Sequence, residues 1–183
     1  VAVNGNVAVV AEVNSETDFV AKNETFQEFV QTVADTALAS DLNGGANGED
    51  IEALLATNRL NDLLVEKTAT IGEKLSVRRF AKVTGDVVTS YIHGGGRIGV
   101  VIAANGTADD AAKEALTNIA MQVAAMNPQY ISRNDISDEE LAKIREITVD
   151  SALNDATTLP KPILNKLLDK AINEKVWSDE DIN

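Results

Sequence analysis

The sequence lacks cysteine and has a single histidine, His93, among its 183 residues. Disulfide bonds and thiolate metal ligands are therefore excluded, and a chain without cysteine is typical of a reducing cytoplasm. One histidine cannot form a metal site that needs several imidazole ligands. We expect no metal and no other cofactor, and we expect a cytoplasmic location.

Aromatic residues, basic residues and long apolar runs are also scarce. Aromatic residues make up only 4% of the chain, so small aliphatic side chains must fill the core. The 16 basic and 29 acidic residues give a net charge of −13, which opposes non-specific binding to nucleic acid or anionic membranes. No apolar run approaches the roughly 20 residues of a membrane-spanning helix. We expect a soluble protein that binds other proteins, with no direct nucleic-acid or membrane partner.

The hydrophobic pattern predicts strands and helices in mixed order. In chain order we expect a strand over 6–14, a helix from 17–24 to Leu38, a loop over 42–48, helices over 49–56 and 60–71, strands over 73–84, 86–92 and 97–104, a helix over 108–126, a helix from a capping box at 137–140 to about 154, a Pro-rich turn over 157–162 and a helix over 163–174. The three consecutive strands have connections too short for a parallel crossover, which predicts an antiparallel meander. The chain begins at Val1 inside a strand-like pattern, so we expect a fragment of a longer protein.

Two parts of the chain resemble each other. Residues 5–14 align with residues 96–105, and each of these strands precedes a helix with a similar apolar stripe. The repeat predicts an α+β fold of two related subdomains, each a small antiparallel sheet packed with helices, plus a projecting helical hairpin. We expect the first core subdomain over 1–72, the second over 73–136, and the hairpin or coiled-coil module over 137–183.

Residues 15–23, SETDFVAKN, join the first strand to the first helix and have two interpretations. The first four residues fit a capping box, and Phe19 lies seven residues before Phe26, as one buried stripe would require. Alternatively, Asp18 and Phe19 contact a partner. The second repeat places Ala108 and Asp109 opposite them, so the shared packing does not require an aromatic residue there. The residues alone leave both interpretations open.

The remaining candidate sites are weaker. Residues 94–99 have the spacing G-x-G-x-x-G, but they lead into a β-branched run, which favours a Gly-rich hairpin over a phosphate loop. His93 is either a hydrogen-bonded turn residue or, with Arg97, an exposed contact residue. The acidic residues around 12–24 have no nucleophile or metal shell beside them, which disfavours an enzyme.

Four segments resemble bacterial elongation factor Ts, in the order in which that family has them. They are residues 12–14 with TDFVAKN at 17–23, IGE at 71–73 with VRRF at 77–80, YIHGGGRIGV at 91–100, and IAMQVAAMNP at 119–128. The resemblance implies a guanine-nucleotide exchange factor rather than an enzyme. Such a factor binds the GTPase elongation factor Tu, displaces Mg²⁺ and promotes GDP release, so that GTP can rebind during translation elongation.

The resemblance also implies which residues bind the partner. Asp18 and Phe19 would be the wedge that enters the nucleotide-binding domain of elongation factor Tu. The full set of implied contact residues is Thr17, Asp18, Phe19 and Val20 with Ile71 and Gly72 on that domain, and His93, Gly94, Gly96 and Arg97 on another domain.

The sequence departs from the family pattern near both ends. The small helical N-terminal domain is missing, as is the segment that returns to the second subdomain after the hairpin. Residues 168–171 read LDKA where the family has Glu-Gly-Arg. An interaction module that forms a homodimer through the hairpin, without exchange activity, is therefore the alternative function, and a small enzyme that uses the Gly-rich loop is the third.

Overall fold

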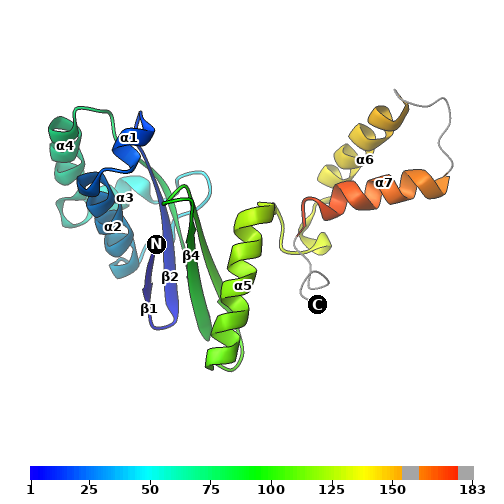
Figure 1. Cartoon of the computed structure of the whole chain (residues 1–183), viewed down its shortest axis with the longest axis horizontal. Coiled ribbons are helices and arrows are strands. Elements are labelled where there is room, and N and C mark those ends of the chain that lie inside the picture. The colour runs from blue at the N-terminus through cyan, green and yellow to red at the C-terminus, as the bar shows by residue number, and fades with distance from the viewer. Residues whose placement is uncertain (154–160, 177–183) are drawn as a thin grey trace. The chain divides into compact units, whose positions relative to one another are not determined.

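The computed structural model describes residues 1–153 and 161–176, which belong to two compact units, Val1–Ala124 and Ala125–Asn183 (Figure 1). In chain order the elements are β1 (Ala2–Asn4), β2 (Val7–Asn14), α1 (Asp18–Ala21), α2 (Glu24–Ala39), α3 (Ile51–Ala56), η1 (Thr57–Arg59), α4 (Leu60–Ile71), β3 (Ser76–Thr84), β4 (Val87–His93), β5 (Ile98–Ala104), α5 (Asp110–Met126), η2 (Arg133–Asp135), α6 (Asp138–Leu153) and α7 (Lys161–Asn173). The predicted division at residues 72 and 136 stays a prediction.

The first unit contains a three-stranded antiparallel sheet in the order β1-β2-β3. β2 pairs with β3 along its whole length, from Val7 opposite Thr84 to Asn14 opposite Ser76. α2 packs against all three strands (Figure 1). The core between them consists of buried side chains from α2 and from both long strands, among them Phe26, Phe29, Val33, Val9 and Phe80.

β4 and β5 form a separate two-stranded antiparallel sheet, from Val87 opposite Ala104 to His93 opposite Ile98. The prediction of a three-stranded meander is therefore wrong, because β3 pairs with β2. Gly85 and Asp86 do not close a hairpin between β3 and β4. The Gly85 N–H donates to the Asn6 carbonyl (3.1 Å), and the Asp86 carboxylate accepts from the Gly106 N–H (3.0 Å), so these bonds direct the chain from one sheet to the other.

α5 packs on the β4–β5 sheet, where Val100, Ala120 and Ala124 are buried together. The Thr89 and Thr117 hydroxyls, 3.1 Å apart, join β4 to the same helix. The predicted fold class is thus confirmed, since two small antiparallel sheets are each packed with helices. Both members of the sequence repeat are a strand followed by a helix.

The helix predicted to begin between residues 17 and 24 and to end at Leu38 is α2, which begins at Glu24 and ends at Ala39, but the separate helix α1 before it was not predicted. The Lys22 and Asn23 N–H groups close α1 on the Phe19 and Val20 carbonyls, at 3.2 and 2.9 Å. Asn23 then caps α2, since its Oδ1 accepts from the Thr25 N–H at 2.8 Å. An N-cap residue starts a new helix, which explains the break.

In the second unit, α6 packs against α7, which confirms the predicted helical pair. Their core consists of Ile136, Ile144, Ile172 and Val176. Ser137 caps α6 by accepting from the Glu140 N–H (3.2 Å), which is one half of the predicted capping box. Residues 157–160 of the predicted Pro-rich turn lie outside the described residues, and residues 161–162 belong to α7. No helix among the described residues is long and apolar enough to span a membrane.

Candidate partner-binding surface

α1 is a single turn of helix in the middle of the SETDFVAKN motif. Its N-cap is Thr17, whose Oγ1 accepts from the Val20 N–H at 3.4 Å. The predicted capping box that starts at Ser15 is therefore wrong by two positions. The Ser15 hydroxyl instead donates to the Thr17 carbonyl at 2.9 Å, and so stabilises the chain before the helix.

Asp18 and Phe19 lie on the outside of α1. The Phe19 side chain is 83% exposed, so the prediction that it belongs to the buried stripe of α2 is wrong. Val20 and Ala21 are the residues of this turn that pack against the core. Among the described residues, the Asp18 carboxylate forms only a long, exposed ion pair with Lys22 (4.0 Å), which contributes little to stability. Neither Asp18 nor Phe19 is therefore needed for the packing of the first unit.

The loop between α4 and β3 lies against the start of α1. The Glu73 carboxylate accepts two hydrogen bonds from Thr17, one from its N–H (3.0 Å) and one from its hydroxyl (2.6 Å). In the opposite direction, the Lys74 N–H donates to the Glu16 carboxylate at 3.3 Å. The structure thus brings together two predicted contact segments, residues 17–20 and 71–72, that are far apart in sequence.

Ile71 and Gly72 end α4 beside this contact. Gly72 is the C-cap residue with φ +80°, and its N–H donates to the Thr68 carbonyl at 2.9 Å. A positive φ favours glycine, which confirms the predicted end of the helix. Ile71 is half-buried against the core, whereas Gly72 is exposed. The role of Glu73 was not predicted, because no local pattern relates it to Thr17.

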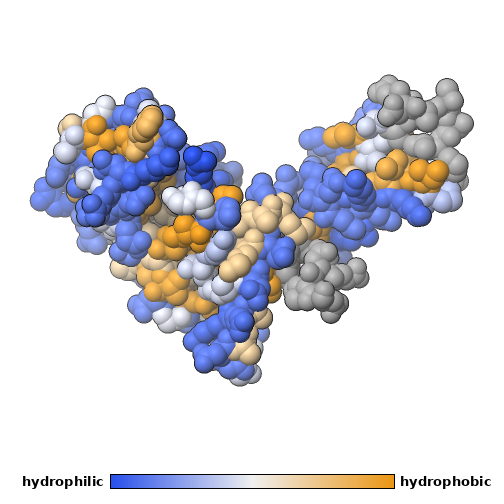
Figure 2. All heavy atoms as spheres, viewed as in Figure 1, coloured by the Kyte–Doolittle hydropathy of each residue, from blue (hydrophilic) through white to orange (hydrophobic). Residues whose placement is uncertain are grey.

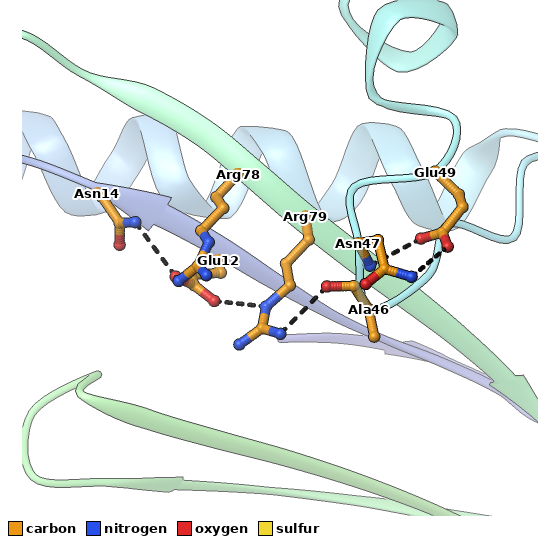
Figure 3. Close-up of polar contacts among 7 residues, drawn as sticks. All are labelled: Glu12, Asn14, Ala46, Asn47, Glu49, Arg78 and Arg79. Atoms are coloured by element: carbon orange, nitrogen blue, oxygen red, sulfur yellow. Dashed lines mark hydrogen bonds and ion pairs between the residues drawn. The ribbon is translucent and has the colours of Figure 1, made fainter.

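His93 is the exposed last residue of β4, and Gly94, Gly96 and Arg97 occupy the exposed turn between β4 and β5. Three consecutive glycines at 94–96 have φ between +62° and +96°, and β5 follows, so the segment is the expected Gly-rich hairpin. The His93 Nδ1 lies 3.0 Å from the Tyr91 hydroxyl. Figures 1 and 3 show this turn at the same end of the first unit as the last residues of β2, which lead into α1.

A charge cluster joins β2 to β3 just before this end (Figure 3). A bulge shifts the register between Glu12 and Val13, and it leaves Arg78 and Arg79 together opposite Glu12. Both guanidinium groups bind the Glu12 carboxylate, at 2.9 and 2.6 Å. Burial alone would raise the pKa of Glu12, but the hydrogen bonds from Arg79, Asn14 and Arg78 lower the pKa below its ordinary value of 4.5.

Arg79 also fixes the loop that follows α2, because it donates to the Ala46 carbonyl at 3.2 Å (Figure 3). Within that loop, Glu49 accepts from the Asn47 N–H at 2.9 Å. Hydrogen bonds from the backbone of Glu49 and from Asn47 lower the pKa of this exposed carboxyl. Arg79 thus joins β3 both to Glu12 of β2 and to the loop that follows α2.

Within residues 1–153 and 161–176, no three His, Asp or Glu side chains lie close enough to hold a metal ion. An exposed aromatic side chain on a well-anchored turn, near exposed loops, is instead typical of a protein-binding module.

Comparison with known proteins agrees with this class. The family model for elongation factor Ts matches residues 16–179. Elongation factor Ts of Clostridioides difficile (strain 630) is 45% identical over 172 residues, which are 90% of this chain and 54% of that protein. The chain therefore belongs to the elongation factor Ts family, and it spans about half the length of this curated relative.

Proposed function

We propose that the protein is a guanine-nucleotide exchange factor for elongation factor Tu in translation elongation. It binds the GTPase, displaces Mg²⁺ and promotes the release of GDP, so that GTP can rebind. It acts by binding alone and makes no covalent change, and it needs no cofactor and no direct contact with nucleic acid or a membrane. This role belongs to the cytoplasm. Family membership supports the proposal.

The observation that carries the proposal is the exposure of Phe19. Burying a phenylalanine side chain stabilises a fold by roughly 1.5–3 kcal/mol, so folding alone would favour a buried ring. Because Phe19 is 83% exposed, its ring gains this free energy only when a partner buries it. Aromatic side chains that insert into a partner's pocket are also the usual source of binding energy at interfaces.

Asp18 and Phe19 act together in the proposed mechanism. Phe19 inserts between structural elements of the nucleotide-binding domain and moves the groups that hold Mg²⁺, while Asp18 brings negative charge toward the phosphates. Mg²⁺ neutralises phosphate charge, so the loss of its coordination weakens the hold on GDP. Because binding free energies are linked, a factor that weakens nucleotide binding is itself expelled when nucleotide rebinds.

The other predicted residues extend the contact in this proposal. Thr17 and Val20 hold the wedge, since one caps α1 and the other packs against the core. Ile71 and Gly72 contact the same domain of the GTPase from the adjoining loop. The exposed β4–β5 turn, with its contact residues His93, Gly94, Gly96 and Arg97, binds a second domain of elongation factor Tu.

A release assay with elongation factor Tu loaded with fluorescent GDP tests the function. The chain is added in increasing amounts, and the loss of bound fluorescence is followed with excess unlabelled GDP present. Acceleration that saturates with the concentration of the chain is the expected result. Binding without acceleration would favour an interaction module, and turnover of nucleotide in the absence of elongation factor Tu would favour an enzyme.

Self-association through α6 and α7 is a second and separate proposal. Ile147 is 60% and Ile163 45% exposed, and Figure 2 shows hydrophobic residues at the surface of these two helices. Exposed apolar side chains of this kind favour a contact with another apolar surface. Sedimentation equilibrium tests whether the chain forms a homodimer, and Ile147→Lys should then dissociate it.

A further inference from the structure

We propose that Glu73 is a positioning residue that holds the Asp18–Phe19 turn in its binding geometry. It acts through Thr17 and does not itself need to touch the GTPase. The inference rests on the proposed exchange function, because it concerns how the wedge of that function is presented. It starts from the two hydrogen bonds that Thr17 donates to one carboxylate.

α1 cannot hold its own conformation. It has four residues and no fully buried side chain. Isolated helices shorter than about 12 residues are only marginally stable in water. The loss of backbone entropy in the first turn outweighs the stabilisation from its hydrogen bonds. The turn therefore needs support from outside itself. Val20 gives apolar support through its packing against the core, and Glu73 gives polar support at the N-cap.

The geometry of the Glu73 contact suits this role. Oε2 accepts from the Thr17 N–H at 3.0 Å, while Oε1 accepts from the Thr17 hydroxyl at 2.6 Å. Hydrogen bonds to an ionised carboxylate are about twice as strong as those between neutral groups. The same Thr17 Oγ1 accepts from the Val20 N–H, so the hydroxyl that caps α1 is itself oriented by Glu73.

A second bond makes the contact reciprocal. The Glu16 carboxylate accepts from the Lys74 N–H at 3.3 Å, next to the Thr17–Glu73 pair. Residues 16–17 and 73–74 are thus joined by three hydrogen bonds that run in both directions. We call these three bonds between residues 16–17 and 73–74 the clamp. Since Gly72 directly precedes Glu73, the clamp also fixes residues 71–72 relative to Phe19. Two separate segments of the chain then meet the partner as one preformed surface.

Loss of Glu73 should change the population of the binding-competent turn rather than its chemistry. When only a fraction of a protein is competent, the apparent dissociation constant rises by the inverse of that fraction. At saturating concentration the partner still selects the competent form. We therefore expect Glu73→Ala to raise the half-saturating concentration in the GDP-release assay about tenfold, with a saturating rate within about twofold of the parent chain.

Amide-proton exchange with water, measured by NMR on the full chain, tests the clamp without elongation factor Tu. Glu73→Ala should speed exchange at the Thr17 and Ala21 amides about tenfold, since hydrogen bonds to charged groups are of this strength. Exchange in α2 and the melting temperature should stay unchanged. Glu28→Ala is the matched control, because the exposed Glu28 carboxylate makes no hydrogen bond or ion pair among the described residues.

Three further variants separate positioning from general stability. Thr17→Ser keeps the hydroxyl that donates to Glu73, so amide-proton exchange at Ala21 should stay as in the parent chain. Glu73→Gln keeps one acceptor oxygen and should give an intermediate effect, and it serves as the test if Glu73→Ala does not fold. In a chain that carries Thr17→Val, Glu73→Ala should have a smaller effect than in the parent chain, because one of the two bonds is already lost.

The outcomes distinguish the clamp from the exchange function. If the parent chain does not accelerate GDP release, the exchange function fails, whereas the amide exchange data still decide whether Glu73 holds α1. Unchanged Thr17 and Ala21 exchange in Glu73→Ala would overturn the clamp. Faster exchange together with an unchanged half-saturating concentration would overturn the positioning role, and so would a lower saturating rate alone, because Glu73 would then act directly.

Discussion

The two strand–helix repeats differ at the point where the strand passes into the helix. In the second repeat, Asp109 caps a continuous α5, with its Oδ1 accepting from the Ala112 N–H at 2.7 Å. In the first repeat, the aligned residue is Phe19, and the helix is divided into α1 and α2 at Lys22 and Asn23. The same architecture therefore folds with and without the exposed turn.

This difference distinguishes the residues that the packing of the fold requires from the residues that are available to bind a partner. The apolar stripes of α2 and α5 are shared, as the alignment of Phe26 with Leu116 shows, since both side chains are buried. Phe19 has no apolar counterpart and is 83% exposed, whereas Phe29 is 1% exposed. The second repeat shows what the scaffold requires, and the additional features of the first repeat are the ones that need a functional explanation.

The largest expected effect is on stability, at Phe29. Phe29→Ala should lower the free energy of unfolding by about 3–5 kcal/mol, because it leaves a cavity in the core of the first unit. Phe19→Ala should change it by less than about 0.5 kcal/mol, as for other exposed positions. Urea unfolding of both variants measures this contrast. Equal losses would mean that Phe19 is part of the core.

The helix caps of the two repeats provide a matched pair of smaller changes. Asn23→Ala and Asp109→Ala should each cost about 1 kcal/mol, because each removes the side chain that caps the longer helix. Urea unfolding measures the cost, and amide exchange locates it. Asn23→Ala should also speed exchange in the first turn of α2. A stabilised Asn23→Ala chain would show that the break between α1 and α2 is strained rather than capped.

The two repeats also differ in how their stability should depend on pH in the acid range. Glu12 binds Arg78 and Arg79, while the aligned residue in β5 is Ala103. A carboxyl with a lowered pKa contributes stability above its unfolded-state value of 4.5, and the contribution is lost as the pH falls through the lower folded-state value.

Glu12→Gln should therefore cost about 1 kcal/mol near neutral pH, a size typical of a partly exposed ion pair. The cost should shrink as the pH falls well below 4.5. Unfolding of both chains by urea between pH 7 and pH 3 measures the difference. A difference that does not change over this range would show that the ion pairs do not stabilise the fold.

Local patterns predicted much of the fold because their causes are local. β2 and α4 lie where alternation and helical spacing predicted them, and Gly72 ends α4 through its own positive φ. The break at Asn23 was missed, since the continuous apolar stripe did not reveal that a capping residue interrupts it. The pairing of β3 with β2 was missed because the two strands are distant in sequence, and a short connection favoured the wrong neighbour.

In the candidate surface, too, local patterns predicted nearby features but not contacts between residues distant in sequence. The sequence suggested Asp18 and Phe19 through their lack of a counterpart in the second repeat, and the exposure of Phe19 agrees with that interpretation. It did not suggest Glu73, whose contact with Thr17 spans 56 positions of the chain. A hydrogen bond over such a distance depends on how β3 and α4 fold back, and no spacing rule describes it.

The most direct test of the exchange mechanism is the GDP-release rate with Phe19→Ala at saturating concentration. If Phe19 is the wedge, the saturating rate should fall at least tenfold, since an anchor residue at an interface contributes about 2 kcal/mol or more. The control is Met121→Ala, which shortens a 44% exposed side chain on α5 of the second repeat. A Phe19→Ala chain with the parent stability and an unchanged saturating rate would contradict the mechanism.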